Sequence, residues 1–130
     1  MSNYDIIAAH YAASDRGDLE GILAPLAPDV SWTEAAGFPC AGTYIGPEAV
    51  RKGVFERLAA EWDGYTASIE KILDAGDTIV GVGTYSGTNK ATGRSFEARL
   101  AHFWQLADGK VVAFEQVTDT LLVARASGSY

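Results

Sequence analysis

Apolar and polar residues alternate most regularly in the last third of the chain, over residues 95–120. The first half of this stretch carries apolar side chains and one histidine at every second position: Ala98, Leu100, His102, Trp104 and Leu106. Side chains of a strand alternate between its two faces, so the pattern predicts a strand with one buried face. Asp108-Gly109 favours the positive φ of a tight turn, and we expect residues 110–120 to return antiparallel beside the first strand.

Two more alternating runs, residues 65–74 and 78–88, precede this hairpin and end in turn-forming residues. Consecutive strands joined by short turns predict an antiparallel meander. Residues 30–34 also alternate, which places Trp32 on the same predicted face as Glu34. Residues 36–46 hold three glycines and show no period, so we expect a flap or rim there rather than a regular element.

Three segments show the apolar spacing of amphipathic helices. The first covers residues 4–16, and the second covers residues 19–26 with Asp18 as its N-cap. The third begins at Pro47, a residue that suits the first helical position. Its predicted buried stripe consists of Val50, Val54, Leu58 and Trp62.

The order of helices, one strand, a helix and four strands is typical of an α+β fold. We expect one domain over residues 1–130, because the chain has the usual length of a single domain. Helices are the elements available to cover one face of the wide, curved sheet. Asp119 is expected to cap or to form a salt bridge at the start of residues 120–126. The tail, residues 124–130, is expected to fray.

Composition narrows the functional classes. The 130 residues are 48% hydrophobic, which suffices for a core, and 17 acidic against 10 basic residues give a net charge of −7. With no basic cluster, this charge argues against nucleic acid or an anionic membrane as a partner. Cys40 is the one cysteine, so no intramolecular disulfide can form, and a reducing cytoplasm fits best. We expect no signal peptide and no membrane span, since no window approaches about 18 apolar residues.

Three stretches resemble the nuclear-transport-factor-2-like superfamily, also called SnoaL-like, which includes ketosteroid isomerase, limonene-epoxide hydrolase, scytalone dehydratase and polyketide cyclases. They are the helix with Tyr11 followed by GDLEGILAPLAPDVSW, then Gly42 with Gly46-Pro47-Glu48, and the final ADGKVVAFEQVTDT. The resemblance implies a cone-shaped α+β barrel of the cystatin-like type, in which a curved antiparallel sheet wraps around three helices and leaves a deep pocket. It also implies a homodimer, for which we expect the outer sheet face to be the interface.

The resemblance assigns candidate site residues. Aligned on GDLEGI, Glu34 falls where ketosteroid isomerase keeps the carboxylate that removes the substrate proton. His102 falls where that enzyme keeps a protonated acid that bonds the enolate oxygen, whereas a register without a gap places Ala101 there. The alternation favours His102. The helix tyrosine that shares the oxyanion corresponds to Tyr11 or, by strict spacing, to His10.

This sequence also departs from two members of the superfamily. The Asp-Arg-Asp set of the hydrolase is replaced by Val82, Thr84 and Gln116. The acidic oxyanion donor of the isomerase is replaced by a histidine. Dehydratases and cyclases of the superfamily use a histidine with an acid in one cavity, and the Glu34–His102 pair is similar in kind.

We therefore predict an isomerase, dehydratase or cyclase that acts by proton transfer, without a cofactor, on a small apolar cyclic or polyketide-like substrate. Burial among aromatic rings would raise the pKa of Glu34 and suit it as the base, with His102 as donor or acid and Tyr11 as a second donor. The expected substrate-binding walls are Trp32, Trp104, Phe114, Gln116 and Leu100. No metal site is expected, because the sequence has no HxH or HxxxH pair. The alternative is a non-catalytic ligand-binding or dimerisation module.

Overall fold

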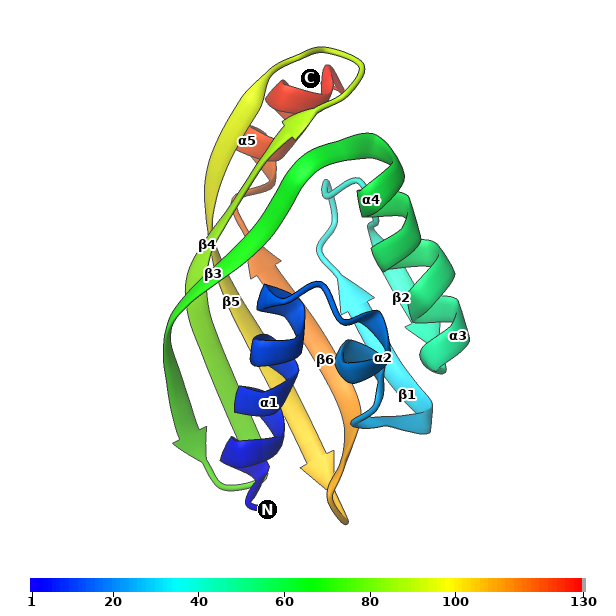
Figure 1. Ribbon diagram of the computed structural model, residues 1–130, viewed down its shortest axis with the longest axis vertical. Coiled ribbons are helices and arrows are strands. Elements are labelled where there is room, and N and C mark those ends of the chain that lie inside the picture. Colours follow the sequence, from blue (N-terminus) through cyan, green and yellow to red (C-terminus); the bar gives the residue numbers. More distant parts are fainter. Residues whose placement is uncertain (130) are drawn as a thin grey trace.

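One curved sheet of six strands carries the fold (Figure 1). The computed structural model describes residues 1–129. The strands are β1 (Leu26–Glu34), β2 (Gly42–Ile45), β3 (Trp62–Ala75), β4 (Thr78–Asn89), β5 (Ser95–Ala107) and β6 (Lys110–Thr118). Their order in the sheet is β2-β1-β6-β5-β4-β3, so β2 and β3 are edges and the sheet is curved but unclosed. This arrangement confirms the predicted α+β class.

The antiparallel meander from β3 to β6 confirms the prediction from alternation. The turn after β5 has Asp108 at φ 51° and Gly109 at φ 74°, the positive values expected there. β1 joins the meander parallel to β6, and their register shifts between Leu26 and Ser31. This irregular half of β1 contains Pro28, which cannot donate a backbone hydrogen bond. Only the regular half, residues 30–34, was therefore visible as an alternating pattern.

The helices are α1 (Asn3–Asp15), α2 (Leu19–Leu23), α3 (Pro47–Val50), the π-helical turn η1 (Arg51–Phe55), α4 (Glu56–Glu61) and α5 (Thr120–Ser127). Ser2 begins α1 with a capping box, in which its hydroxyl accepts from the Asp5 amide at 3.1 Å. Asp18 caps α2 as predicted, accepting from the Gly21 amide at 3.0 Å. Segments α3, η1 and α4 follow one another directly and form the predicted third helix, which ends at Glu61. Trp62 was predicted on the buried stripe of this helix, but it is buried as the first residue of β3.

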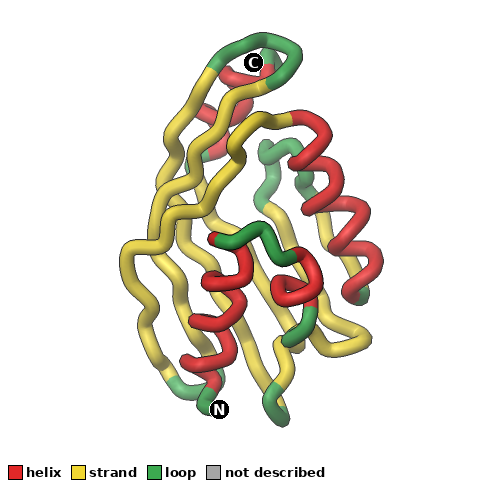
Figure 2. The backbone as a smooth tube through the Cα atoms, in the orientation of Figure 1, coloured by secondary structure: helices red, strands yellow, loops and turns green. Residues whose placement is uncertain are grey.

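The helices α1 and α2 and the α3–η1–α4 helix lie against the same face of the sheet (Figure 2). Every second residue of β5 from Phe96 to Leu106 is buried beneath them, as the alternation predicted. The hydrophobic core lies between this sheet face and the helices. Within residues 1–129, no helix has both the length and the apolar character needed to cross a bilayer.

Two predictions about irregular segments were wrong. Residues 36–46 include the strand β2, which pairs antiparallel with the end of β1 from Ser31↔Ile45 to Glu34↔Gly42. This strand has four residues, lies at a sheet edge and is largely exposed, so no apolar alternation reveals it. Residues 124–127 belong to α5 and do not fray, because the side chains of Val123 and Ala126 are buried. Asp119 caps this helix as predicted, accepting from the Leu122 amide at 3.3 Å, while residue 130 lies outside the described part.

Candidate functional site

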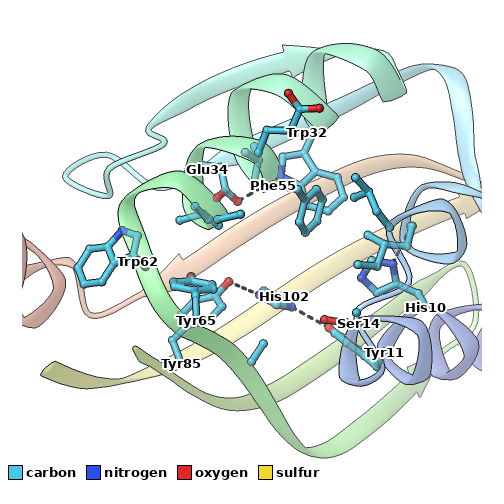
Figure 3. A pocket seen from close by; sticks show the side chains of 18 of the residues that line it. His10, Tyr11, Ser14, Trp32, Glu34, Phe55, Trp62, Tyr65, Tyr85 and His102 are labelled. Atoms are coloured by element: carbon cyan, nitrogen blue, oxygen red, sulfur yellow. Dashed lines mark hydrogen bonds between the residues drawn. The ribbon is translucent and has the colours of Figure 1, made fainter. Parts of the chain in front are cut away.

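A cavity of about 540 Å³ lies between the helices and the buried face of the sheet (Figure 3). Aromatic side chains form much of its wall, and the polar groups among them include Glu34, Tyr11 and His102. These three predicted residues come from β1, α1 and β5, and the fold brings them to one cavity. A largely apolar cavity of this size with a few polar groups is typical of small-molecule sites.

Glu34 is the last residue of β1, and 3% of its surface is exposed. Its Oε2 accepts a hydrogen bond from Nε1 of Trp32 at 3.2 Å. Burial raises the pKa of the carboxyl group to about 8, against a smaller lowering by the Trp32 bond. Near neutral pH, Glu34 is therefore mostly a neutral acid. Its carboxylate form, which dominates above pH 8, is a stronger base than an ordinary glutamate.

His102 lies between two tyrosines. Its Nδ1 is 2.8 Å from the hydroxyl oxygen of Tyr11, and its Nε2 is 2.5 Å from the hydroxyl oxygen of Tyr85. Burial, with a smaller effect of the nearby second imidazole, His10, lowers the pKa of His102 to about 3. The imidazole is therefore neutral at pH 7. Because both ring nitrogens are bonded to hydroxyl groups, His102 reaches a ligand through Tyr11 or Tyr85.

Tyr11 is held at a fixed place over the sheet. Its hydroxyl accepts from Nε1 of Trp104 at 2.8 Å, and burial raises its pKa. Gly81 of β4, the register partner of His102, lies directly beneath it. A Cβ atom on Gly81 would stand 2.2 Å from the Tyr11 hydroxyl oxygen, so glycine is required for this approach.

The sequence left open whether Tyr11 or His10 faces the pocket, and both line the cavity. Nδ1 of His10 donates to the Ile22 carbonyl at 3.0 Å, which fixes the proton on that nitrogen. Burial lowers the pKa of His10 to about 4, so this imidazole is also neutral at pH 7. Of the two, Tyr11 is the residue that bonds His102.

Three of the five predicted wall residues line the cavity. Trp32 and Phe114 stack with ring centroids 3.9 Å apart, and Trp104 lies 4.5 Å from Phe114. Leu100 and Gln116 do not line it. Leu100 is part of the closed core, and Gln116 lies behind the wall, where it accepts from the Ala35 amide and donates to the Tyr85 hydroxyl, both at 3.0 Å. Parity gives the face of a strand, but it does not tell where along the strand the cavity ends.

Sequence reasoning missed Tyr85 and Tyr65, which also line the cavity. Tyr85 could have been found, because it shares the buried parity of Ile79 and Gly81 in β4. Among residues 1–129, no three His, Cys, Asp or Glu side chains are grouped closely enough to hold a metal ion.

The fold and the cavity define a class of α+β proteins with a small-molecule pocket between a curved sheet and its helices. The chain belongs to the SnoaL-like family, since its residues 7–114 match the SnoaL-like domain. This confirms the resemblance stated from the sequence. A comparison with curated protein sequences gave no match.

Solved structures agree with this assignment. An NTF2-like protein from Burkholderia thailandensis is 56% identical over 97% of each chain, with a TM-score of 0.96. TerC, co-crystallized with polyporic acid, is 26% identical over 95% of this chain and 96% of its own, with a TM-score of 0.83. IdmH from Streptomyces antibioticus, a proposed polyketide cyclase, is 26% identical over the same shares, with a TM-score of 0.75.

Proposed function

We propose that this protein is an isomerase, dehydratase or cyclase that acts by proton transfer on an apolar cyclic or polyketide-like substrate, without a cofactor. One observation carries the proposal: the buried carboxyl of Glu34 and the hydroxyl of Tyr11 line the same apolar cavity. The complex of TerC with polyporic acid and the proposed cyclase role of IdmH support this substrate class.

In this proposal Glu34 is the general base. With a pKa of about 8, roughly a tenth of the carboxyl groups are ionised at pH 7, and this minority form binds a proton strongly. The Tyr11 hydroxyl donates to the substrate oxygen that gains negative charge, and the Trp104 N–H that it accepts strengthens it as a donor. His102 acts through Tyr11, as a positioning residue, because its own nitrogens are engaged.

The second candidate is a ligand-binding module without catalysis. It is favoured by the largely protonated state of Glu34 at neutral pH, in which the carboxyl donates a hydrogen bond and does not remove a proton. A thermal-shift screen with cyclic ketones, polyketide mimics and polyporic acid identifies ligands, because binding raises the apparent stability. Turnover of a bound ligand that increases from pH 6 to pH 9 supports the enzyme. If ligands stabilise the protein but are not converted at any pH in this range, the protein is a binding module without catalysis.

We also propose a homodimer through the outer face of the sheet, the face away from the helices. Phe103, Val117 and Leu73 share this face and are 39%, 49% and 48% exposed. Light scattering after size exclusion at micromolar concentration should give twice 13.8 kDa. Phe103→Glu should give the monomer, whereas Leu121→Glu, on the exposed side of α5, should not. A monomeric wild-type protein would refute the dimer.

A further inference from the structure

Five side chains form a continuous hydrogen-bonded chain beside the cavity, and Figure 3 shows its central part, from Tyr11 through His102 to Tyr85. In order they are Trp104, Tyr11, His102, Tyr85 and Gln116. Both ends of the chain can only donate toward its middle. The indole of Trp104 has no acceptor, and the amide oxygen of Gln116 already accepts from the Ala35 amide, which directs its NH₂ group at Tyr85.

The number of protons in this chain exceeds the number of contacts. Its four contacts are served by five N–H or O–H groups: one each from Trp104, Gln116, Tyr11, Tyr85 and the neutral imidazole of His102. One hydroxyl proton therefore has no partner within the chain.

The tautomer of His102 decides which hydroxyl this is. With its proton on Nδ1, the imidazole donates to Tyr11 and accepts from Tyr85, so the Tyr11 O–H is the one left over. With its proton on Nε2, both bonds reverse and the Tyr85 O–H is left over. Both tyrosines line the cavity, where a buried donor needs an acceptor.

We propose that neutral His102 is a tautomeric switch that selects Tyr11 or Tyr85 as the donor to a ligand oxygen. Tyr85 thereby becomes a second donor position, which the sequence did not reveal. In Figure 3, Tyr85 and Glu34 lie on one side of His102 and Tyr11 lies on the other. Tyr85 also experiences the charge of Glu34, which raises its pKa after the larger effect of burial. The ligand class is thus a molecule with an acceptor oxygen, such as a carbonyl group or a hydroxyl group that leaves.

Switching from the first tautomer to the second moves one proton along the chain. Tyr11 gives its outward proton to the ligand oxygen, the Nδ1 proton of His102 passes to Tyr11, and the Tyr85 proton passes to Nε2. Tyr85 then takes a proton from the carboxylic acid of Glu34, directly or through one water, so that the three residues keep their charge. The net result is a proton transfer within the ligand: the proton that Glu34 removed from a carbon atom arrives at an oxygen atom. As a catalytic step this rests on the function proposed above, whereas the switch itself does not.

The tautomer is measurable by ¹⁵N NMR of the imidazoles at pH 7 without any substrate. The sequence has two histidines, and His10 is an internal reference because the Ile22 carbonyl fixes its proton on Nδ1. In the free wild-type protein, the tautomer of His102 identifies the hydroxyl that is free without a ligand, since Tyr11 and Tyr85 each already accept one bond, from Trp104 and from Gln116. Tyr85→Phe should give Nδ1–H, with Tyr11 as acceptor. Tyr11→Phe should give Nε2–H, since a buried N–H without an acceptor is more costly than a bare lone pair.

The matched control is Tyr44→Phe, which removes a hydroxyl bonded to the Cys40 carbonyl and should leave the His102 signals unchanged. The same tautomer in both Tyr11→Phe and Tyr85→Phe, or a doubly protonated His102 at pH 7, would overturn the proposal and leave the role of Glu34 untouched. Each variant has its own expected tautomer, so either one suffices if the other does not fold.

A binding measurement gives a second test. Acetophenone has one acceptor oxygen and no donor, so either tyrosine can serve it. Each single Phe variant should weaken its Kd less than about threefold, and the double variant should weaken it about tenfold. A Tyr11→Phe variant that loses as much affinity as the double variant would show that Tyr85 is not a donor.

Discussion

Replacing Glu34 with Gln should lower kcat/KM at pH 8 by about 1,000-fold, because general-base catalysis commonly contributes a factor of about 100 to 10,000. The amide keeps the size of the side chain and can still accept from Trp32 Nε1, but it cannot take a proton. Steady-state kinetics on a substrate found by the ligand screen gives the value. Glu115→Gln, an exposed carboxylate of β6, is the control and should keep wild-type turnover.

The same substitution should change stability in a pH-dependent way. The pKa of Glu34 is higher in the folded state than in the unfolded chain, so the wild-type contribution of this group falls as pH rises from about 4.5 to about 8. Within that interval Glu34→Gln should gain about 1.4 kcal/mol per pH unit relative to wild type in urea unfolding. Unchanged turnover would remove Glu34 from the mechanism, and a variant that does not fold would contradict the expected gain.

Gly81→Ala should destabilise the protein by about 3 kcal/mol and weaken ligand binding. The new methyl group would stand 2.2 Å from the Tyr11 hydroxyl oxygen and 2.8 Å from Cζ of the ring, so Tyr11 must leave its bonds to His102 and Trp104. Overpacking costs about 1–3 kcal/mol, and each lost hydrogen bond adds about 1 kcal/mol. Urea unfolding and thermal-shift titration measure both effects.

Gly87→Ala in the same strand is the control for this prediction. Its added Cβ would meet no atom closer than 3.3 Å, and we expect a loss below about 1 kcal/mol. In the Gly81→Ala background, Tyr11→Phe should cost less than it does alone, because the clashing oxygen is gone. Equal stability of wild type and Gly81→Ala would show that the position of the Tyr11 ring over Gly81 does not contribute to the stability of the fold.

The parts of the site that the sequence predicted follow from local periodicity. The period of two in β5 decides that His102 faces inward together with Trp104, and the same rule puts Glu34 beside Trp32 in β1. The buried stripe from Pro47 onward likewise predicts one helix across the sheet. Such features need only the spacing of neighbouring residues.

The parts that could not be predicted depend on residues distant in the chain. Gln116 has the correct parity, but its amide is bound by the Ala35 backbone and by Tyr85. The need for glycine at position 81 arises from Tyr11, 70 positions earlier in the sequence. β2 forms because the end of β1 offers an edge for pairing, and its own side chains give no sign of that.

The central claim is that Glu34 faces an apolar cavity as a carboxyl group that is mostly neutral at pH 7. Its pKa can be measured in the wild-type protein by ¹³C NMR with glutamate labelled at the side-chain carboxyl, and the resonance is assigned by its absence from Glu34→Gln. We predict a titration midpoint at about 8. A midpoint near the ordinary glutamate value of about 4.5 would contradict the account, because Glu34 would then be a solvated carboxylate and a weak base.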